Sequence, residues 1–375
     1  MEVALGSMEN PLAAGPMSAE AKGLQLLQSA KRVDLKRLMR ARDDPTFVRY
    51  MEHMRRTDAD APIPEELLDG LEAVTDKDVQ NDGAWRFAPI GVLSHIERDS
   101  INHEQMHAFA RFFNLPVICW RLELVDQSFA EEEVREQLFQ EEKNLWGYFV
   151  EGAPVHLLET IKSVRKLVNG SPGLLDSVVA ANEADQRLIR TSYQAGYATV
   201  ILEAPPRAVN IIVGGSKEAP RLWHEVPLED LSSLLPDYIE GEQIIPVQVS
   251  KAAEDAECTS MFAAQEDLPP ALKVKQHQYG FAFALTDYKL QGRTLEKLVL
   301  SLCFRSKQPT MTLAAFYVLV SRVRKRSGLR LLLRDEAGIK QLRQKKHKEE
   351  LHAWENGYRN GKWDGERAVK AYCDL

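Results

Sequence analysis

A chain of 375 residues, of which 44% are hydrophobic and 27% charged, has the size and composition of an ordinary globular protein with two or three domains. No apolar run approaches the roughly 20 residues of a bilayer span, the start carries no secretory signal pattern, and the four cysteines form no C-x-x-C pair, so we expect an intracellular protein with reduced thiols. The net charge of −7 argues against nucleic acid as a bulk partner, but charge is unevenly distributed, with an acidic segment at 123–142 and a basic segment at 321–348.

The first elements in chain order lie close to the N-terminus. Residues 1–24 are rich in Ala, Gly, Met and Pro without periodicity and predict a flexible leader. Residues 33–56 have the apolar spacing of a helix, with a break at Asp44-Pro45, because proline disfavours a helical conformation of the residue before it.

A β-α-β pattern follows. Residues 88–93 predict a short buried strand, residues 97–113 a helix, and residues 116–120 a second strand. A charged helix over 129–145 and a strand over 148–158, bent near its middle, continue the alternation. This order predicts an α/β fold in which helices flank a parallel sheet.

The middle of the chain has a different character. Residues 170–272 contain short β-like runs separated by Pro and Gly, which predict a small β-rich, barrel-like insertion. The α/β pattern then resumes and ends with the apolar run LRLLL, the expected last strand of the sheet. We therefore expect a discontinuous α/β domain over 25–169 and 273–335, and a charged helical tail over 336–375.

One stretch of the predicted helix reads HEQMH, which matches the H-E-x-x-H pattern of zinc peptidases. In that pattern two histidines one helical turn apart bind zinc and the glutamate acts as general base, so the candidate residues are His103, Glu104 and His107. The extended pattern fails, because Ala110 and Phe113 occupy its Gly and third His positions. Short motifs of this kind recur by chance, and we expect no metal here.

A helical wheel of residues 97–113 supports the same interpretation. Apolar side chains gather around Ile101, Ala108 and Phe112, and the two histidines lie nearly opposite them. The pattern predicts that both histidines face solvent on the polar side of an amphipathic helix.

Two later stretches carry a more informative set of side chains. Residues 285–295 read LTDYKLQGRTL, in which a predicted strand runs into T-x-x-K-x-Q-G-x-T. This loop offers a hydroxyl, an ammonium, an amide and a tight glycine turn, which are groups suited to contact a phosphate backbone. Residues 316–323 read FYVLVSRV and place an arginine at the end of an apolar run.

These two stretches resemble the fifth and sixth signature motifs of superfamily-one DNA helicases of the petite-integration-frequency (PIF) and RecD type, which typically read T-x-H-K-x-Q-G-x-T and Y-V-A-x-S-R. Upstream segments at 35–55, 88–102 and 149–175 resemble further landmarks of the family, in the family's order. The resemblance covers roughly residues 35–335. It implies that the α/β domain is the second RecA-like domain of such a helicase and that the insertion is the family's small barrel.

The resemblance implies a role for each matching residue. Arg322 would be the arginine finger that reaches the γ-phosphate of ATP across the cleft between two RecA-like domains, and Arg40 would be a second phosphate-sensing arginine. Gln291 would couple the DNA-contacting loop to the nucleotide site. The implied nucleic-acid-binding residues are Thr286, Lys289, Gly292, Thr294, Asn102 and Asn169.

The sequence also departs from the family. Tyr288 stands where the fifth motif has His, and His95 stands where an upstream segment has Asn. The stretch NGYRNGKWD contains Gly-Lys, but Trp363 replaces the Ser or Thr of a working phosphate-binding loop. Asp335-Glu336 follows the sixth motif, whereas the family's magnesium-binding strand lies before the fifth. We therefore expect ATP and Mg²⁺ as cofactors only if a first RecA-like domain is supplied in cis or in trans, and none for the isolated chain.

The implied function is the C-terminal motor domain of an ATP-dependent DNA helicase, inactive alone, with single-stranded DNA as partner, no membrane, and roles in DNA repair and recombination. Both the nucleus and the mitochondrion stay open as locations. The alternative is a degenerate relative that acts as an interaction module for protein or nucleic acid, and a zinc metallopeptidase is a distant third. Trp85, Trp120 and Trp223 could stack on bases, although Trp120 ends an apolar strand and is expected in the core.

Overall fold

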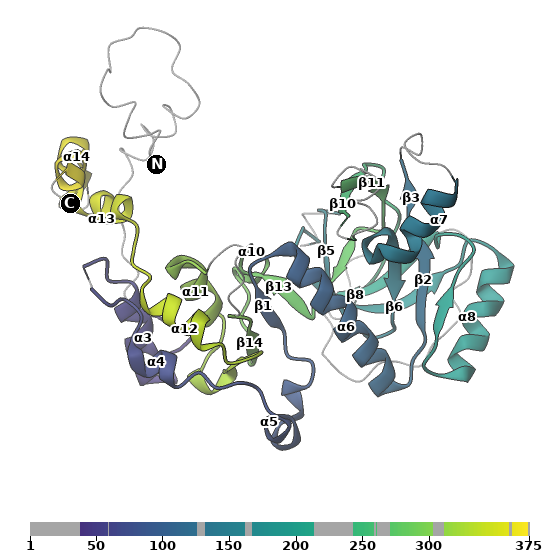
Figure 1. The fold of residues 1–375 in the computed structure, drawn as a ribbon, viewed down its shortest axis with the longest axis horizontal. Coiled ribbons are helices and arrows are strands. Elements are labelled where there is room, and N and C mark those ends of the chain that lie inside the picture. The colour runs from purple at the N-terminus through teal and green to yellow at the C-terminus, as the bar shows by residue number, and fades with distance from the viewer. Residues whose placement is uncertain are drawn as a thin grey trace, which may run out of the picture. The chain divides into compact units, whose positions relative to one another are not determined.

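The chain forms two compact units, which are described one at a time (Figure 1). Unit 1 consists of Met1–Ser94 and Thr286–Leu375, and unit 2 of His95–Leu285. The expected leader and Trp223 lie outside the described residues. The computed structural model describes residues 38–58, 60–125, 132–161, 167–213, 243–258, 260, 271–302, 311–359 and 362–373.

Unit 1 contains a parallel sheet in which β14 lies between β1 and β15. All three strands are short and apolar, and helices α11 and α12 lie beside them (Figure 1). The helices of unit 1 are α3 (Pro45–Met54), α4 (Glu65–Asp69), α5 (Asp76–Asn81), α10 (Asp287–Leu290), α11 (Leu313–Val320), α12 (Glu336–Arg343), α13 (Glu349–Asn356) and α14 (Gly365–Cys373). Its strands are β1 (Ile90–Val92), β14 (Leu298–Leu300), β15 (Leu329–Leu331), β16 (Tyr358–Arg359) and β17 (Lys362–Trp363), and its 3₁₀ helices are η2 (Gly83–Trp85) and η6 (Arg326–Gly328).

Helix α3 begins where the sequence predicts a break. Asp44 is the N-cap and accepts a hydrogen bond from the backbone N of Phe47 at 3.0 Å, and Pro45 occupies the first helical position, where its missing N–H costs nothing. The buried side chains of the helix are Phe47, Tyr50, Met51 and Met54, which have the spacing of a single helical face.

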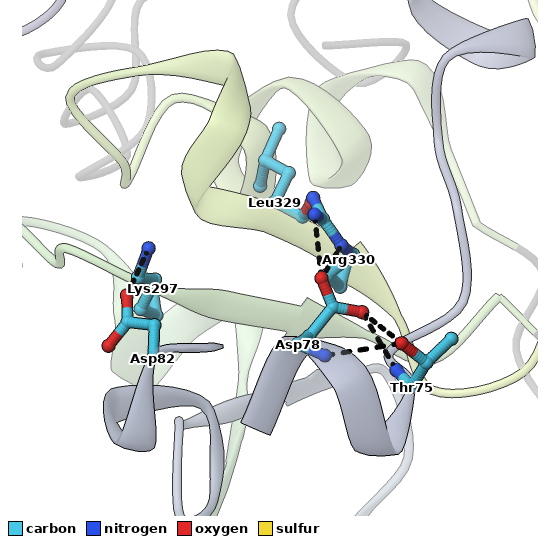
Figure 2. Close-up of polar contacts among 6 residues, drawn as sticks. All are labelled: Thr75, Asp78, Asp82, Lys297, Leu329 and Arg330. Atoms are coloured by element: carbon cyan, nitrogen blue, oxygen red, sulfur yellow. Dashed lines mark hydrogen bonds and ion pairs between the residues drawn. The ribbon is translucent and has the colours of Figure 1, made fainter. Parts of the chain in front are cut away.

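Helix α5 is tied to the sheet of unit 1 by paired charges (Figure 2). Asp78 accepts hydrogen bonds from Oγ1 of Thr75 at 2.7 Å and from Nη2 of Arg330 at 2.8 Å, and Oδ2 of Asp82 lies 2.9 Å from Nζ of Lys297. The hydrogen bond from Thr75, followed by the one from Arg330, lowers the pKa of Asp78 to about 2. These contacts hold the segment before β1 against β14 and β15.

Trp85 is enclosed by the same two cations. Nζ of Lys297 lies 4.8 Å, and Cζ of Arg330 5.1 Å, from the centroid of the indole ring, which is within the range of cation–π attraction. The side chain is buried, so within unit 1 Trp85 serves packing rather than the base stacking considered for it from the sequence.

Unit 2 consists of three sheets and the helices packed on them, with α8 beside the sheet that contains β2 (Figure 1). The sheet orders are β4-β2-β7, β10-β11-β3 and β12-β5-β6-β8-β9. Its helices are α6 (His95–Phe113), α7 (Glu132–Glu141) and α8 (Glu183–Ala195), with the 3₁₀ helix η3 (Lys143–Leu145). Its strands are β2 (Val117–Arg121), β3 (Glu123–Leu124), β4 (Trp146–Phe149), β5 (Pro154–Leu157), β6 (Pro172–Val179), β7 (Thr199–Ile201), β8 (Ala208–Val213), β9 (Gln243–Val247), β10 (Glu254–Glu257), β11 (Ala271–Lys275) and β12 (Tyr279–Phe281), and β13 (Ala284–Thr286) leads back to unit 1.

The predicted α/β class and a parallel sheet flanked by helices are confirmed, but one prediction about that sheet is wrong. The strands expected at 88–93 and 116–120 form, as β1 and β2, yet they belong to different sheets. β1 pairs with β14, whereas β2 pairs with β4 antiparallel and with β7 parallel. The apolar run of each strand predicts that the strand forms. It does not predict the pairing partner, because residues outside the run determine the pairing.

The segment expected as an insertion shares a sheet with its flanks. β6, β8 and β9 come from 170–272, and β5 and β12, which complete their five-stranded sheet, come from outside it. The segment also contains α8, which was not predicted, although Asn182 is a recognisable N-cap whose side chain accepts from the backbone N of Asp185 at 2.8 Å. The expected boundaries at 170 and 272 therefore differ from the boundaries of the two units.

The C-terminal segment, expected as a charged helical tail, contains α12, α13 and α14 and also the hairpin of β16 and β17. The ring of Trp354 on α13 lies 4.8 Å from that of Trp363 on β17, so the hairpin packs on the helix. Among the described helices, none combines the length and the apolar character that crossing a bilayer requires.

A pair of carboxyl groups is buried inside unit 2. Glu151, in the turn between β4 and β5, is 1% exposed, and Asp176 lies at a β-bulge of β6 and is 2% exposed. The phenol of Tyr193 on α8 lies near Glu151, and Oγ of Ser177 donates to Asp176 at 2.9 Å. Burial, helped by the charge of Asp176, raises the pKa of Glu151 to about 8.

Candidate functional site

The loop that carries the predicted DNA contacts starts at the end of β13. Thr286 is buried at the N-cap position of α10, where its side chain makes no capping hydrogen bond, and six residues later Gly292 adopts a positive φ of 84°. A Cβ at Gly292 would meet no atom within 4 Å, so the glycine is required for its conformation rather than for space. Leu290 is fully buried and anchors the short helix.

The rest of this loop faces outward. Gln291, Gly292 and Thr294 are exposed, and Lys289 is half-buried. The predicted contacts at Lys289, Gln291, Gly292 and Thr294 therefore lie on one accessible segment, while the hydroxyl of Thr286 lies beneath it. Their contact with DNA stays a prediction.

Arg40 reaches this loop from a turn near the start of the described chain. Its Nε donates to Oγ1 of Thr294 at 3.0 Å, and its Nη1 donates to the carbonyl oxygen of Ser321 at 2.7 Å. Arg40 and Ser321 are 281 positions apart in the sequence. Arg40 is thus bonded to the residue that precedes Arg322, so the fold places the two predicted phosphate-sensing arginines next to each other.

Arg322 follows the C-terminal end of α11. Its Nε donates to the carbonyl oxygen of Val318 at 2.7 Å, and its Nη2 donates to Oγ of Ser321 at 2.7 Å. A cation at this end of a helix is stabilised by the partial negative charge of the terminal carbonyls. The side chain is 9% exposed, so it is neither a free surface arginine nor a fully enclosed one.

The two arginines form a pair of positive charges that no carboxylate among the described residues neutralises. Within the described part of the chain, neither guanidinium forms an ion pair with a carboxylate, and their hydrogen-bond acceptors are neutral. Burial, and then the charge of Arg40, lower the pKa of the Arg322 guanidinium. A tetrahedral anion such as a phosphate would relieve this repulsion, and guanidinium groups match its geometry.

The backbone links the arginine pair to the loop. The N–H of Leu295 donates to the carbonyl oxygen of Arg322 at 2.9 Å, and Leu295 forms a parallel bridge with Val323. Together with the Arg40–Thr294 bond, this makes one continuous set of contacts from the exposed loop to both guanidinium groups. Sequence reasoning assigned no role to Ser321, although the serine of the Y-V-x-x-S-R pattern was its signal.

Asn102 is a buried residue of α6 in unit 2. Its Oδ1 accepts from the backbone N of Ala284 at 2.7 Å, and its Nδ2 donates to the carbonyl oxygen of Ala284 at 3.1 Å. The amide is therefore fully engaged with β13, the strand that leads into the loop. A direct DNA contact by Asn102 stays a prediction, and the contacts within unit 2 favour a positioning role.

Asn102→Ala is expected to lower the free energy of unfolding of unit 2 by about 2–4 kcal/mol, because it leaves a buried N–H and C=O of Ala284 without partners. Urea unfolding of the full chain measures this loss. Asn169→Ala is the matched control, since Asn169 is exposed in the turn before β6 and should change stability by about 0.5 kcal/mol or less. Equal stability of the two variants would contradict the positioning role.

The HEQMH histidines are half-buried, whereas the sequence predicted that both face solvent. The side chain of His103 is 17% exposed and lies 5.4 Å from the ring of Tyr148, and the hydroxyl of Tyr197 lies 3.3 Å from Nδ1 of His107. The buried face of α6 is centred on Asn102, Met106 and Phe109. Because the polar Asn102 packs inward, the buried face is rotated from its predicted position. Phe112, which was expected in the apolar stripe, is 51% exposed.

The acidic residues that follow β15 were also considered as possible metal ligands. The described residues contain no group of three or more His, Cys, Asp or Glu side chains that could hold a metal ion. Oδ1 of Asp335 accepts from the backbone N of Ala337 at 3.0 Å and thereby caps α12, just after β15. This confirms the interpretation of LRLLL as a strand of the sheet followed by a turn.

Two further residues, Trp120 and Gly173, serve packing within unit 2. Trp120 is a core residue, as predicted, and its ring lies 5.3 Å from that of His277. A Cβ at Gly173 would lie 2.8 Å from the carbonyl oxygen of Ile212, so this glycine allows β6 and β8 to approach closely.

Comparisons with known proteins find similar folds but no similar sequences. No protein-family model and no curated protein matches the chain. The structure is similar to that of the Pif1 helicase from Candida albicans, with 16% identity and a TM-score of 0.44, over 84% of this chain and 59% of that one. It is also similar to the Bacteroides Pif1 helicase in complex with ADP-AlF3 and ssDNA, with 13% identity and a TM-score of 0.46, over 94% of this chain and 66% of that one.

Both of these structures are of Pif1 helicases. The chain spans about three fifths of the length of the first of these structures. At this identity the likeness concerns the fold alone.

Proposed function

We propose that the chain is the second RecA-like domain of a superfamily-one DNA helicase of the Pif1/RecD type. In this role the loop 286–294 contacts single-stranded DNA, and Arg322 and Arg40 contact the phosphates of ATP. The observation that carries the proposal is the convergence of the two arginines on Ser321, without a neutralising carboxylate among the described residues. Such a pair stabilises negative charge that develops during phosphoryl transfer.

The charge of the two units agrees with this division of labour. Unit 1, which holds the arginines and the loop, has more basic than acidic residues, whereas unit 2 has nearly twice as many acidic as basic residues. A basic unit attracts a polyanion, and an acidic one does not.

ATP with Mg²⁺ would be bound chiefly by a first RecA-like domain, in cis or in trans. The arginine pair fits a phosphate group, but no described acidic cluster fits Mg²⁺. The bound nucleotide supplies the phosphoryl group; Arg322 and Arg40 bind and orient it, and Thr294 holds Arg40 in place. The isolated chain would then bind DNA without hydrolysing ATP.

The alternative of an interaction module has weaker support. Three arginines of the basic segment 321–348 are already neutralised within unit 1: Arg330 by Asp78, Arg334 by Glu336, and Arg343 by Glu65 and Asp69. That segment therefore offers less free charge than its sequence suggests.

The test is the binding of a labelled single-stranded oligonucleotide by the full chain at several salt concentrations. We expect binding that weakens as salt rises and no ATP hydrolysis. Lys289→Ala should weaken binding and reduce the salt slope by about 1, while Lys340→Ala, which removes an exposed charge of α12 outside the loop, should do neither.

Two outcomes would contradict the proposal. Binding that shows no dependence on salt would remove the DNA contact. DNA-stimulated ATP hydrolysis that disappears in Arg322→Ala would show that the chain alone holds a complete nucleotide site.

A further inference from the structure

Tyr288 is the most exposed large hydrophobic side chain among the described residues. It is 81% exposed, on the short helix α10 at the tip of the loop. Leu290, two positions later, is fully buried, and its Cδ1 lies 3.3 Å from the place that a Cβ of Gly91 would occupy beside β1. Residues two apart on a helix point to nearly opposite sides, so the anchoring of Leu290 turns Tyr288 outward.

The ring of Tyr288 has no partner among the described residues. Among the described residues it contacts no other aromatic ring and no cation, and its hydroxyl has no hydrogen-bond partner. A single exposed ring is ordinary on a protein surface. What distinguishes Tyr288 is its position, one residue before Lys289. The exposed amide of Gln291 and Gly292 follow in the same loop, and a Cβ at Gly292 would meet no atom within 4 Å.

We propose that Tyr288 stacks on a base of the nucleic-acid strand that the loop binds. Cationic and amide donors contact phosphates, and an adjacent exposed ring can contact the apolar face of a base. Only an unpaired strand presents that face, because the bases of a duplex are stacked on one another. This inference rests on the proposed function. It adds that the site recognises the bases of an unpaired strand as well as its phosphates.

The identity of the side chain supports stacking of any base. Every base has a π-face, so stacking on tyrosine tolerates any sequence. The resembling helicases have histidine at this position, which carries a smaller ring and a titratable charge.

The test compares two strands of equal length, an oligothymidylate and an abasic oligonucleotide with the same sugar-phosphate backbone. For the full chain, Tyr288→Ala should weaken binding of oligothymidylate about tenfold and leave binding of the abasic strand unchanged. Tyr288→Phe, which retains the ring, should bind both strands as the wild type does. Phe112→Ala, which removes an exposed ring of α6 in unit 2, is the control for nonspecific loss of an aromatic surface.

The outcomes separate this inference from the proposed function. If Tyr288→Ala binds oligothymidylate as tightly as wild type, or loses affinity for both strands equally, the stacking role is wrong while DNA binding stands. If wild type binds neither strand, the proposed function fails and the stacking role fails with it.

Discussion

Glu151→Gln is expected to stabilise unit 2 at pH 8 and above by on the order of 3 kcal/mol, which makes it an unusual substitution of a buried residue that increases stability. Glu151 is almost completely buried beside a second carboxyl group, that of Asp176. Burial raises its pKa to about 8 from an ordinary value near 4.5. Glutamine keeps the shape of the protonated side chain, but it never becomes charged.

The sign of the pH dependence follows from which state holds the proton. Below about pH 4.5, Glu151 is protonated in both the folded and the unfolded chain, so its contribution to stability is fully present. Between pH 4.5 and about 8 the folded chain retains a proton that the unfolded chain has released, and stability falls with rising pH. Above pH 8 the loss is complete. The variant lacks this decline.

Urea unfolding of the full chain at several pH values between 4 and 9, followed by hydrogen exchange of unit 2, measures the difference. The two proteins should be nearly equal at pH 4 and diverge above it. Glu133→Gln on α7 is the control, since this glutamate is exposed and should show no such divergence. Asp176→Asn should shift the decline to lower pH, because the charge of Asp176 helps to raise the pKa of Glu151. Parallel pH profiles of Glu151→Gln and wild type would contradict the assignment.

Local signals in the sequence account for the elements that were predicted well. The break at Asp44-Pro45 is visible because the capping carboxylate and the proline are adjacent residues, and the helix they start has a regular apolar face. β1, β15 and α11 are similarly marked by short uninterrupted apolar runs. In each case the physical cause lies within a few residues of the element it determines.

The errors have non-local causes. β1 and β2 are both readable as strands, but the pairing of β1 with β14 depends on residues about two hundred positions away. The face of α6 was misplaced because Asn102 is buried, and an asparagine is acceptable in a core only when a distant backbone, here that of Ala284, satisfies both ends of its amide. Apolar periodicity considers only the polarity of each side chain, so it contains no information about a distant hydrogen-bond partner.

Some features of the candidate site are also visible in the local sequence, and others depend on the tertiary structure. The loop motif and Arg322 are recognisable as local patterns, and family resemblance singled out Arg40. Their convergence on Ser321 and Thr294 could not be derived from spacing, because it joins segments at opposite ends of the chain. The exposure of Tyr288 is equally tertiary, since it follows from the burial of Leu290 in the layer beneath.

Arg40→Gln and Arg322→Gln are each expected to weaken binding of tripolyphosphate to the full chain about tenfold, since a charge-assisted hydrogen bond contributes about 1.5–3 kcal/mol. Tripolyphosphate isolates the anion contact from the contacts of base and ribose. When a first RecA-like domain with ATP and Mg²⁺ is supplied, loss of Arg322 should lower the hydrolysis rate by on the order of 10³-fold or more, as expected for an arginine that acts in the transition state.

Arg343→Gln is the matched control for these two substitutions. Arg343 carries the same charge in the same unit, but Glu65 and Asp69 lie 2.9 Å and 2.7 Å from its guanidinium and neutralise it. Its loss should leave tripolyphosphate binding within about twofold of wild type, because a neutralised guanidinium gains little from a further anion.

A purely structural role for Arg322 makes a different prediction, and the two roles are separable. Its bonds to Val318 and Ser321 stabilise the end of α11, so any substitution is expected to lower thermal stability somewhat. Arg322→Lys keeps a cation at the helix end and should restore most of that stability, yet lysine lacks the planar fork and should restore anion binding only in part. If Arg322→Gln loses stability but binds tripolyphosphate as tightly as Arg343→Gln, then Arg322 is only a helix cap, and the pair of positive charges that supports the motor-domain assignment is not an anion site.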